Sequence, residues 1–383
     1  MNKTVLILGG GIGGIVAASR LRKSLPREHR VILVEREPRH LFQPSLLWLM
    51  TGDRAPENIS RPLDVLARRG IEVVRGNIEG IDPARRAVQV NGTELTGDYL
   101  VIALGAELAP ETIPGLSEAG HNFYTLAGAQ ALREARLQLN AGKLVVLVSG
   151  VPFKCPAAPY EAAMLLESDV RRRGLRERVS VAIYSPEPGP MGTAGPEVSA
   201  MLRQTVEGRG IAYYPEHAVT KVDPQERQIY FTNNTTVKFD LLAYVPPHRA
   251  PKVVREAGLC GESGWAAVNR FKFETKFPGV YAIGDVTGIA LAIGKPLPKA
   301  GVFAHGQAEV VAHNIAVAVT GRGEERMFTG HGECFVEIGD GRAGFGSGNF
   351  YAEPKPRVTF HPPSRWRHWG KVMYEKYWLY RWF

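Results

Sequence analysis

A glycine-rich turn between two apolar segments constrains the fold of this chain more than any other feature. Residues 4–8 predict a buried strand, and residues 9–14 then satisfy the pattern G-x-G-x-x-G. A helix-compatible segment at 15–25 and a second apolar strand at 30–34 follow, and the unit ends on Glu35. The glycines of such a βαβ unit permit a sharp turn, close approach of a pyrophosphate and close helix–strand packing. The segment therefore predicts a dinucleotide site, with a ribose bound by Glu35.

Later segments supply further expected cofactor contacts. The apolar strand at 98–105 ends in a glycine, a pattern that closes the first nucleotide domain of many flavoproteins near the diphosphate. The strand at 279–285 ends in Gly-Asp, and in two-domain flavoproteins this aspartate binds the ribityl chain of FAD. Lys299 precedes a predicted helix at 302–319, where it can meet negative charge on a reduced flavin; the alternative is a solvated surface lysine. The expected cofactor residues are Gly9, Gly11, Ile12, Gly14, Glu35, Arg36, Gln43, Ile78, Gly105, Gly284, Asp285 and Lys299.

A second nucleotide-type domain is predicted, but its nucleotide signature is missing. The strand at 144–148 repeats the apolar pattern of the first strand, whereas the loop at 149–161 carries prolines in place of a glycine fingerprint. Proline lacks an N–H and has a fixed φ, so this loop is a poor cradle for NAD. We therefore expect an α/β protein with two Rossmann-like domains, an FAD domain and a degenerate NAD-type domain. The expected divisions are 1–112 and 251–322 for the FAD domain, 113–250 for the second domain and 323–383 for a C-terminal region with an amphipathic membrane-docking helix.

The composition limits the classes of partner. The chain of 383 residues has 44% hydrophobic residues and a net charge of +9, which fits two or three folded domains that favour anionic surfaces. No apolar run is long enough to span a bilayer and no apolar leader precedes the first strand, so we expect neither a membrane-spanning helix nor a signal peptide. No cysteine spacing typical of a metal site is present. We expect no nucleic-acid partner, and self-association into a homo-oligomer is left open.

Two of the three cysteines fall where redox chemistry is expected. Cys155 lies on the loop after the second domain's first strand, the end at which α/β sheets bind ligands, and Cys334 lies on a later apolar strand. If their Cα atoms lie within about 7 Å, the two can form a disulfide or hold sulfur between them. Glu161 begins a helix, and its carboxylate can take a proton from a thiol or complement the helix dipole. Cys260 has no partner in this arrangement and is expected to be structural.

The last eighteen residues, 366–383, combine aromatic and basic side chains. Spacings of three and four residues place five of the apolar residues on one face of a predicted helix, and these are Trp366, Trp369, Met373, Tyr377 and Tyr380. Aromatic rings with interleaved cations are typical of a helix in a bilayer interface; the alternative is a helix docked on protein. We expect a peripheral protein of the cell membrane, on a face that the sequence does not indicate. The expected anchor residues are Trp366, Trp369, Tyr377, Trp378 and Trp382.

Together these motifs resemble the sulfide:quinone oxidoreductases, within the two-domain disulfide-reductase-like flavoproteins. The resemblance covers essentially the whole chain. Its carriers include Cys334-Phe335, and its specific elements are the run at 154–161 and the aromatic tail. It implies FAD, a bridge between Cys155 and Cys334 that sulfide attacks to leave a persulfide, and electron transfer to a quinone reached from the membrane. By resemblance, Phe303 and Phe335 are candidates for the quinone pocket. Sulfur would then grow as a polysulfide or pass to an acceptor.

The chain departs from that family at two positions. Many members carry another cysteine near the position of Tyr124, sometimes linked to the flavin, and a histidine near the position of Gly128. This chain has neither, so it resembles the two-cysteine forms. We expect FAD to be bound without a covalent link, and the acid–base assignment is left open.

Other functions are left open by the sequence. A flavocytochrome c-type sulfide dehydrogenase is expected to carry a secretory signal and does not require the aromatic tail. A type II NADH:quinone oxidoreductase is expected to carry a glycine fingerprint at 149–156, where this chain has prolines. A non-catalytic flavin redox sensor, or a sulfur-carrying protein of the membrane surface, would not turn over sulfide with a quinone.

Overall fold

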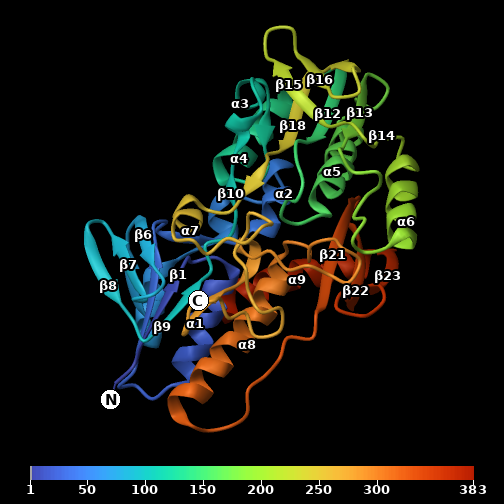
Figure 1. Cartoon of the computed structure of the whole chain (residues 1–383). Helices are drawn as coiled ribbons and strands as arrows, with labels where there is room; N and C mark the ends of the chain where they lie inside the picture. Colours follow the sequence, from blue (N-terminus) through green and yellow to red (C-terminus); the bar gives the residue numbers. More distant parts are fainter. Residues whose placement is uncertain (1) are drawn as a thin grey trace.

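The computed structural model describes residues 2–383, which contain two parallel sheets of five strands each. Figure 1 shows the first sheet among the blue segments at the lower left and the second among the green segments at the top. The strand order of the first sheet is β20–β9–β1–β2–β5. These strands are β1 (Thr4–Leu8), β2 (Arg30–Glu35), β5 (Glu72–Arg75), β9 (Tyr99–Ile102) and β20 (Val280–Ala282).

Both faces of the first sheet are buried, and successive side chains alternate between them. Ile7 and Val101 face helices α1 and α8, whereas Leu6 and Leu100 face the small antiparallel sheet β6–β7–β8. Strands covered on both faces have continuous apolar sequences, which explains the composition of residues 4–8. The covering elements are α1 (Ile12–Ser24), α8 (Gly301–Thr320), β6 (Ile78–Asp82), β7 (Ala87–Val90) and β8 (Thr93–Thr96).

The second sheet repeats this plan in the order β11–β18–β12–β13–β14. Helices α4, α5 and α6 cover one face, and α3 with the antiparallel sheet β15–β16–β17 covers the other. The two parallel sheets confirm the expected α/β fold class. The elements are β11 (His121–Asn122), β12 (Gly142–Val148), β13 (Val179–Tyr184), β14 (Ala212–Tyr214), β15 (Val219–Asp223), β16 (Gln228–Phe231), β17 (Thr236–Lys238), β18 (Leu241–Val245), α3 (Leu116–Ala119), α4 (Leu126–Gln138), α5 (Ala158–Arg172) and α6 (Pro196–Glu207).

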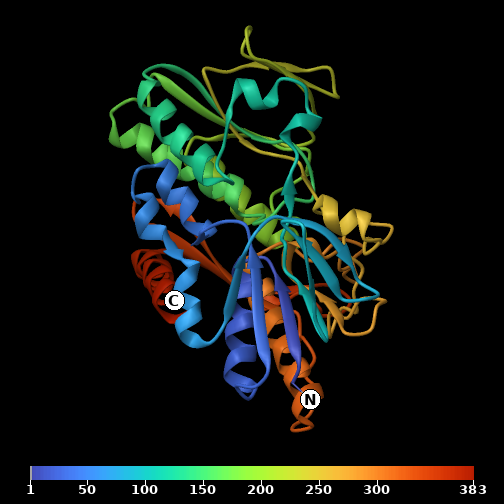
Figure 2. The same ribbon diagram turned by 90° about the vertical axis from the view of Figure 1, so that its left-hand side faces the viewer.

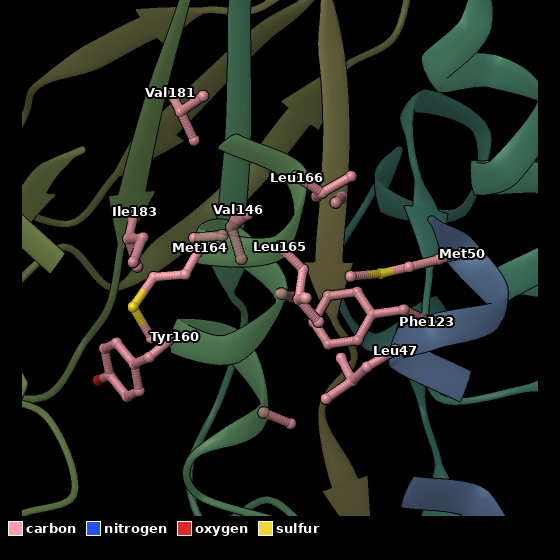
Figure 3. Close-up of a cluster of buried hydrophobic side chains, with 14 of the residues drawn as sticks. Leu47, Met50, Phe123, Val146, Tyr160, Met164, Leu165, Leu166, Val181 and Ile183 are labelled. Atoms are coloured by element: carbon pink, nitrogen blue, oxygen red, sulfur yellow. The ribbon is translucent and has the colours of Figure 1, made fainter. Parts of the chain in front are cut away.

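A short helix from the first part of the chain, α2 (Leu46–Met50), is built into the core of the second domain. Figure 3 shows Leu47 and Met50 of this helix pointing toward Phe123. Arg136 of α4 donates to the carbonyl oxygen of Met50 and forms a buried ion pair of 2.7 Å with Asp169 of α5. The two domains are therefore joined by a shared core as well as by chain connections.

The remaining elements link the domains and shape their edges. Strand β20 follows the second domain in sequence yet completes the first sheet, as the division of the FAD domain into two parts predicts; the residue boundaries themselves stay predictions. The linking elements are β3 (Arg39–Leu41), β4 (Ser60–Pro62), β10 (Glu107–Leu108), β19 (His248–Arg249), α7 (Lys252–Glu256) and the short 3-10 helices Gln43–Ser45, Pro56–Ile59, Leu63–Arg69, Pro110–Thr112 and Gly284–Val286.

The C-terminal region forms a three-stranded antiparallel sheet followed by the helix α9 (Arg365–Arg381). The Ser364 hydroxyl caps this helix by accepting from the Arg367 N–H at 3.2 Å. Strand β21 contacts α5, and α9 packs on β22, so the region connects to the second domain. Figure 2 shows α9, in red, on the outside of the molecule. The strands are β21 (His331–Gly339), β22 (Arg342–Asn349) and β23 (Arg357–Ser364).

Helix α9 has one exposed aromatic face and one buried face. The five residues that the spacing placed together are all exposed, from 55% for Tyr377 to 86% for Trp366. Trp378 and Trp382 are only 1% and 3% exposed and pack with His305 in the core of the first domain. Their assignment to the membrane anchor is therefore wrong, because both lie on the opposite side of the helix from Trp366.

His40 connects the buried face of α9 to the glycine turn. Its Nδ1 lies 2.8 Å from the carbonyl oxygen of Gly10, and Nε2 lies 3.2 Å from Nε1 of Trp378. The indole can only donate, so Nε2 accepts and Nδ1 carries the proton that is donated to Gly10. Burial lowers the pKa of His40 from 6.5 to about 4, against the opposing effect of the Gly10 hydrogen bond.

This buried histidine predicts a loss of stability in mild acid. The unfolded chain binds a proton on His40 near pH 6.5 and the folded chain only near pH 4, so stability is retained above pH 6.5 and falls between these values. The contribution of His40 to this fall is about 3 kcal/mol. We expect His40→Gln to remove that part of the pH dependence of urea unfolding. His331→Gln, at an exposed position, is the control, and parallel profiles for the wild type and His40→Gln would contradict the assignment.

Candidate active site

The glycine turn has a geometry that excludes side chains at two positions. Gly9 has a φ of +102°, and a Cβ on Gly14 would lie 1.8 Å from the carbonyl oxygen of Gly9. The Gly9 N–H also donates to the carbonyl oxygen of Val34 at 2.8 Å, which fixes the turn against β2. The first and third glycines therefore serve the turn and the close approach of α1 to β1.

The other side of the turn is open and suits a phosphate group. Gly11 caps the N-terminus of α1, and a Cβ built on it would have no atom of residues 2–383 within 4 Å. The Glu35 carboxylate accepts from the N–H groups of Gly10 at 2.6 Å and Glu37 at 3.0 Å, which holds it at the edge of the turn. Free N–H groups, an open approach and a fixed carboxylate fit the diphosphate and ribose of FAD.

The N-terminus of α8 meets that of α1 at the same place. A Cβ on Gly301 would lie 2.4 Å from Cδ1 of Ile12, so the first turns of the two helices are in contact. Gly105, at the end of β9, has a φ of +67° and no described atom near its Cβ position. The convergence of two helix N-termini concentrates partial positive charge on the expected diphosphate position.

Lys299 is buried just before α8. Its Nζ donates to the carbonyl oxygens of Asp285 at 2.8 Å and Thr287 at 2.9 Å, and lies 3.3 Å from the ring centroid of Trp265. The alternative of a solvated surface lysine is therefore wrong. Burial lowers the pKa of Lys299 to about 8, although the charge of Asp285 opposes this shift. Its contact with a flavin stays a prediction.

The other expected cofactor residues fall into two groups. Arg36 is exposed at the end of β2, and Ile78 begins β6 close to that end, because the Gly76 N–H donates to the carbonyl oxygen of Glu35. Gln43 instead lies toward the second domain, where it accepts from Nζ of Lys154 at 3.1 Å. Gly284 has a φ of +75° and donates its N–H to the Gln307 side chain. The contacts of these residues with a cofactor stay predictions.

The Cys155 loop lies directly against the first domain. Its backbone N–H donates to the carbonyl oxygen of Lys299 at 2.6 Å, and the Tyr124 hydroxyl donates to the carbonyl oxygen of Lys154 at 2.9 Å. Cys155 has a φ of +55°, a left-handed conformation that costs a residue with a side chain on the order of 1–3 kcal/mol and is concentrated at functional sites. The loop thus holds the cysteine in a strained but well-fixed position beside residue 299.

Cys334 approaches the same region from strand β21. Both cysteines are free thiols, Cys155 being partly buried and Cys334 exposed. Burial raises the pKa of the Cys155 thiol well above its usual range, with Glu161 and Cys334 adding to the shift and Lys371 opposing it. Although Cys334 reaches solvent, the protein crowded around it raises its pKa to about 12, again with Glu161 adding and Lys371 opposing. Glu161 and Lys371 each affect the pKa of both thiols, so these four groups lie close together.

Glu161 forms a buried ion pair with the C-terminal helix. This side chain is 1% exposed, and its Oε1 accepts from Nζ of Lys371 at 2.8 Å and from the backbone N–H of Glu337 at 2.8 Å. Burial alone would lower the pKa of Lys371, but the carboxylates of Glu161 and Glu337 outweigh it and raise the pKa above its usual range. The raised pKa keeps the Lys371 ammonium charged beside the thiols.

The pair extends toward the surface through two more residues. Nδ1 of His368 lies 3.1 Å from both carboxylate oxygens of Glu337, and the His368 side chain is partly exposed. Trp48 of α2 lies beside this cluster, with the Lys371 Nζ 5.1 Å from its ring centroid. The cluster joins α5, β21 and α9 at the two thiols.

The two phenylalanines assigned to a quinone pocket lie in different surroundings. Phe303 is 3% exposed and packs edge-to-face against Phe350 in the core of the first domain, beside Lys299 on the lining of a small cavity. Phe335 is partly buried next to Gly370 of α9 and packs against Phe345. The structure does not bring these two rings into contact, and their role stays a prediction.

Sequence reasoning missed Lys371, Glu337 and His368. Lys371 belongs to a buried face of α9 whose residues recur at four- and three-residue intervals through Glu375 and Trp378. That spacing was visible in the sequence, but the many exposed aromatic residues of the same helix concealed it. Glu337 and His368 gave no signal, because the contacts that matter join segments far apart in the chain.

The chain was compared with known proteins. A model of the pyridine nucleotide-disulphide oxidoreductase family matches residues 3–308. The chain belongs to this family.

The sulfide-quinone reductase of Aquifex aeolicus is 29% identical over 399 aligned positions, which cover 100% of this chain and 91% of the relative. The mitochondrial sulfide:quinone oxidoreductase of Mus musculus is 24% identical, with 93% and 80% covered. The X-ray structure of the sulfide:quinone oxidoreductase from A. aeolicus superposes with a TM-score of 0.90 at 27% identity, covering 99% of this chain and 91% of that one.

The buried ion pair predicts a large stability loss when one partner is removed. Lys371→Met leaves the Glu161 carboxylate buried without its cation, which should lower the free energy of unfolding by about 3 kcal/mol. Lys376→Met on the same helix is the control, because this half-exposed lysine should contribute less than about 1 kcal/mol. Urea unfolding of both variants measures the difference. Equal losses would show that the Glu161–Lys371 pair is not specifically stabilising.

Proposed function

We propose that this protein oxidises sulfide and passes the electrons through FAD to a quinone. The observation that carries the proposal is the pair of thiols at the junction of the two domains, beside a buried Glu161–Lys371 pair, where an NAD-binding domain would carry its glycine turn. The similarity over the full chain to a protein named sulfide-quinone reductase supports the same activity. A Pro-rich loop in place of the NAD fingerprint disfavours an NADH-dependent alternative.

FAD is the cofactor that the first domain fits. The turn at residues 9–14, Glu35 and the end of β20 would hold its diphosphate, ribose and ribityl chain, and the bound flavin would supply a two-electron acceptor. Related flavoproteins that link a cysteine to the flavin carry it near the position of Tyr124. In this chain the Tyr124 hydroxyl donates to the carbonyl oxygen of Lys154, and we infer that the flavin is held without a covalent link.

The chemistry at the two cysteines follows from their surroundings. In the oxidised protein a bridge between Cys155 and Cys334 is the electrophile, and hydrosulfide attacks one sulfur while the other leaves as a thiolate. The attacked cysteine then carries a persulfide, and the cation of Lys371 stabilises the thiolate that leaves. Glu161 lies where its carboxylate can accept a proton from a thiol at this site. Bound FAD would supply the acceptor for the electron pair gained by the cysteines, and the quinone would receive that pair in turn.

The exposed face of α9 supports attachment to a membrane surface. Trp366, Trp369, Met373, Tyr377 and Tyr380 form this face, which we call the aromatic face. Within residues 2–383 no helix is both long and apolar enough to cross a bilayer. We propose that the aromatic face lies in the interface of the membrane that holds the quinone, because rings and cations together favour that depth.

Substitution of either cysteine tests the proposed chemistry. Cys155→Ser and Cys334→Ser should each slow sulfide-dependent bleaching of the flavin's visible absorption by roughly a hundredfold or more, because neither can form the bridge. Anaerobic stopped-flow spectroscopy measures this rate. Cys260→Ser is the control and should bleach as the wild type does. Unchanged bleaching in Cys155→Ser, or bleaching by NADH in place of sulfide, would contradict the proposed function.

Substitution on the aromatic face tests membrane attachment separately. Truncation before α9 would be uninformative, because it removes the buried Trp378, Glu375 and Lys371 as well. The double variant Trp366→Ser/Trp369→Ser should reduce partitioning onto phosphatidylcholine vesicles by about tenfold, since two exposed rings leave the interface. Met327→Ser, at another exposed apolar position, should leave partitioning unchanged. Vesicle flotation measures both, and equal recovery of all three proteins would contradict attachment through α9.

A further inference from the structure

A cavity lined by cations lies at the C-terminal end of α9. It has a volume of about 210 Å³ and lies where the end of α9 meets the last turns of α1 and of the 3-10 helix Leu63–Arg69. Five of its lining residues are basic and none is acidic, and we call this site the basic cavity. The basic residues are Arg20, Arg22, Lys23, Arg69 and Arg381.

Most of this charge has no carboxylate partner. Arg20 is paired with Glu309 at the margin. The Arg22 guanidinium donates to the backbone carbonyl oxygen of His29, a contact that satisfies a hydrogen bond but cancels no charge. The Arg69 guanidinium donates to the carbonyl oxygen of Arg381 and to an oxygen of Phe383, which belongs to the terminal carboxylate of this chain, so Arg69 is paired. No side-chain carboxylate in the described chain is ion-paired with Arg22, Lys23, Arg69 or Arg381.

Two polar groups of the basic cavity also lack hydrogen-bond partners. Trp382 is 3% exposed, and its Nε1–H has no acceptor among the described residues; the buried Oγ of Ser19 likewise has none. The indole is flanked by Arg20 and Arg381, whose guanidinium carbons lie 5.5 and 5.3 Å from the ring. Buried donors without partners are exceptional in folded proteins. A buried donor in a cavity whose lining keeps unpaired cations, Arg381 among them, indicates an anionic acceptor from outside the chain.

The position of the basic cavity identifies the source of that anion. Arg381 and Trp382 follow Tyr380 directly, so the cavity adjoins the end of the aromatic face. Aromatic side chains in an interface lie at the depth of the lipid headgroups, which is the depth of the phosphates. The cavity holds several times the roughly 30 Å³ that one water occupies, enough for a phosphate group with part of its headgroup.

We propose that the basic cavity binds the phosphate of an anionic phospholipid headgroup. The inference rests on the proposed membrane attachment of α9 and adds a lipid preference to it. Arg22, Lys23 and Arg381 would neutralise the phosphate, and the Trp382 N–H would donate to one of its oxygens. Free phosphate offers the same chemistry, but only a lipid phosphate is held beside the aromatic face.

The test compares vesicles of phosphatidylcholine with vesicles that also contain phosphatidylglycerol, using the full chain with its flavin. The wild type should bind the phosphatidylglycerol vesicles more tightly. Lys23→Gln removes a charge that makes no hydrogen bond or ion pair within residues 2–383, and Trp382→Phe keeps the buried ring but removes the N–H. Each should weaken binding to the phosphatidylglycerol vesicles by roughly fivefold and leave binding to phosphatidylcholine unchanged.

Lys376→Gln is the control, because it removes a positive charge from α9 outside the basic cavity. A diffuse attraction to anionic lipid would make Lys376→Gln as damaging as Lys23→Gln and leave Trp382→Phe unaffected, and that result would overturn the proposal. Inorganic phosphate, compared with chloride at equal ionic strength, should compete only weakly; full competition at low concentration would assign the site to free phosphate instead. Failure of the wild type to bind either vesicle would refute attachment itself, whereas equal binding to both would refute only the basic cavity.

Discussion

The buried ion pair between Glu161 and Lys371 fixes the relative position of three parts of the chain. One partner begins α5 in the second domain, the other lies on α9, and the Glu337 N–H that shares the carboxylate belongs to β21. Charges removed from water are tolerated only when they are paired in good geometry. The strand that carries Cys334 and the helix with the aromatic face must therefore dock together on α5.

The two nucleotide-type domains show how one plan accommodates two chemistries. In the first, glycines bring the backbone of α1 within reach of a diphosphate. In the second, the equivalent loop turns toward the first domain, and its Cys155 N–H bonds to the carbonyl oxygen of Lys299. The prolines of this loop stand where a dinucleotide site would carry its glycines, so the loop offers a poor backbone cradle for a second dinucleotide. The missing glycine fingerprint and the position of Cys155 are thus features of the same loop.

The elements that could be predicted from the sequence depend on interactions between residues close together in the chain. The glycine turn, the buried strands and the helix that follows Ser364 depend on φ angles, hydrophobic patterns and a cap, all of which lie within a few residues. The failures concern partners distant in the chain. Trp378 and Trp382 matched an anchor by composition, but the pocket that buries them comes from residues such as His40 and His305. Lys299 was placed at a helix start, while Trp265 and the carbonyl oxygens that enclose it could not be inferred.

His40 links the glycine turn of the first domain to the C-terminal helix. Its imidazole joins the Gly10 carbonyl oxygen to the Trp378 indole, so the glycine turn and helix α9 share one neutral ring. Coupling between two binding events is reciprocal in free energy. If bound FAD stabilises the docked position of α9 through this ring, the proposed binding of α9 to a bilayer would stabilise bound FAD by the same free energy. FAD would then be bound most tightly when the protein is attached to the membrane that holds the quinone.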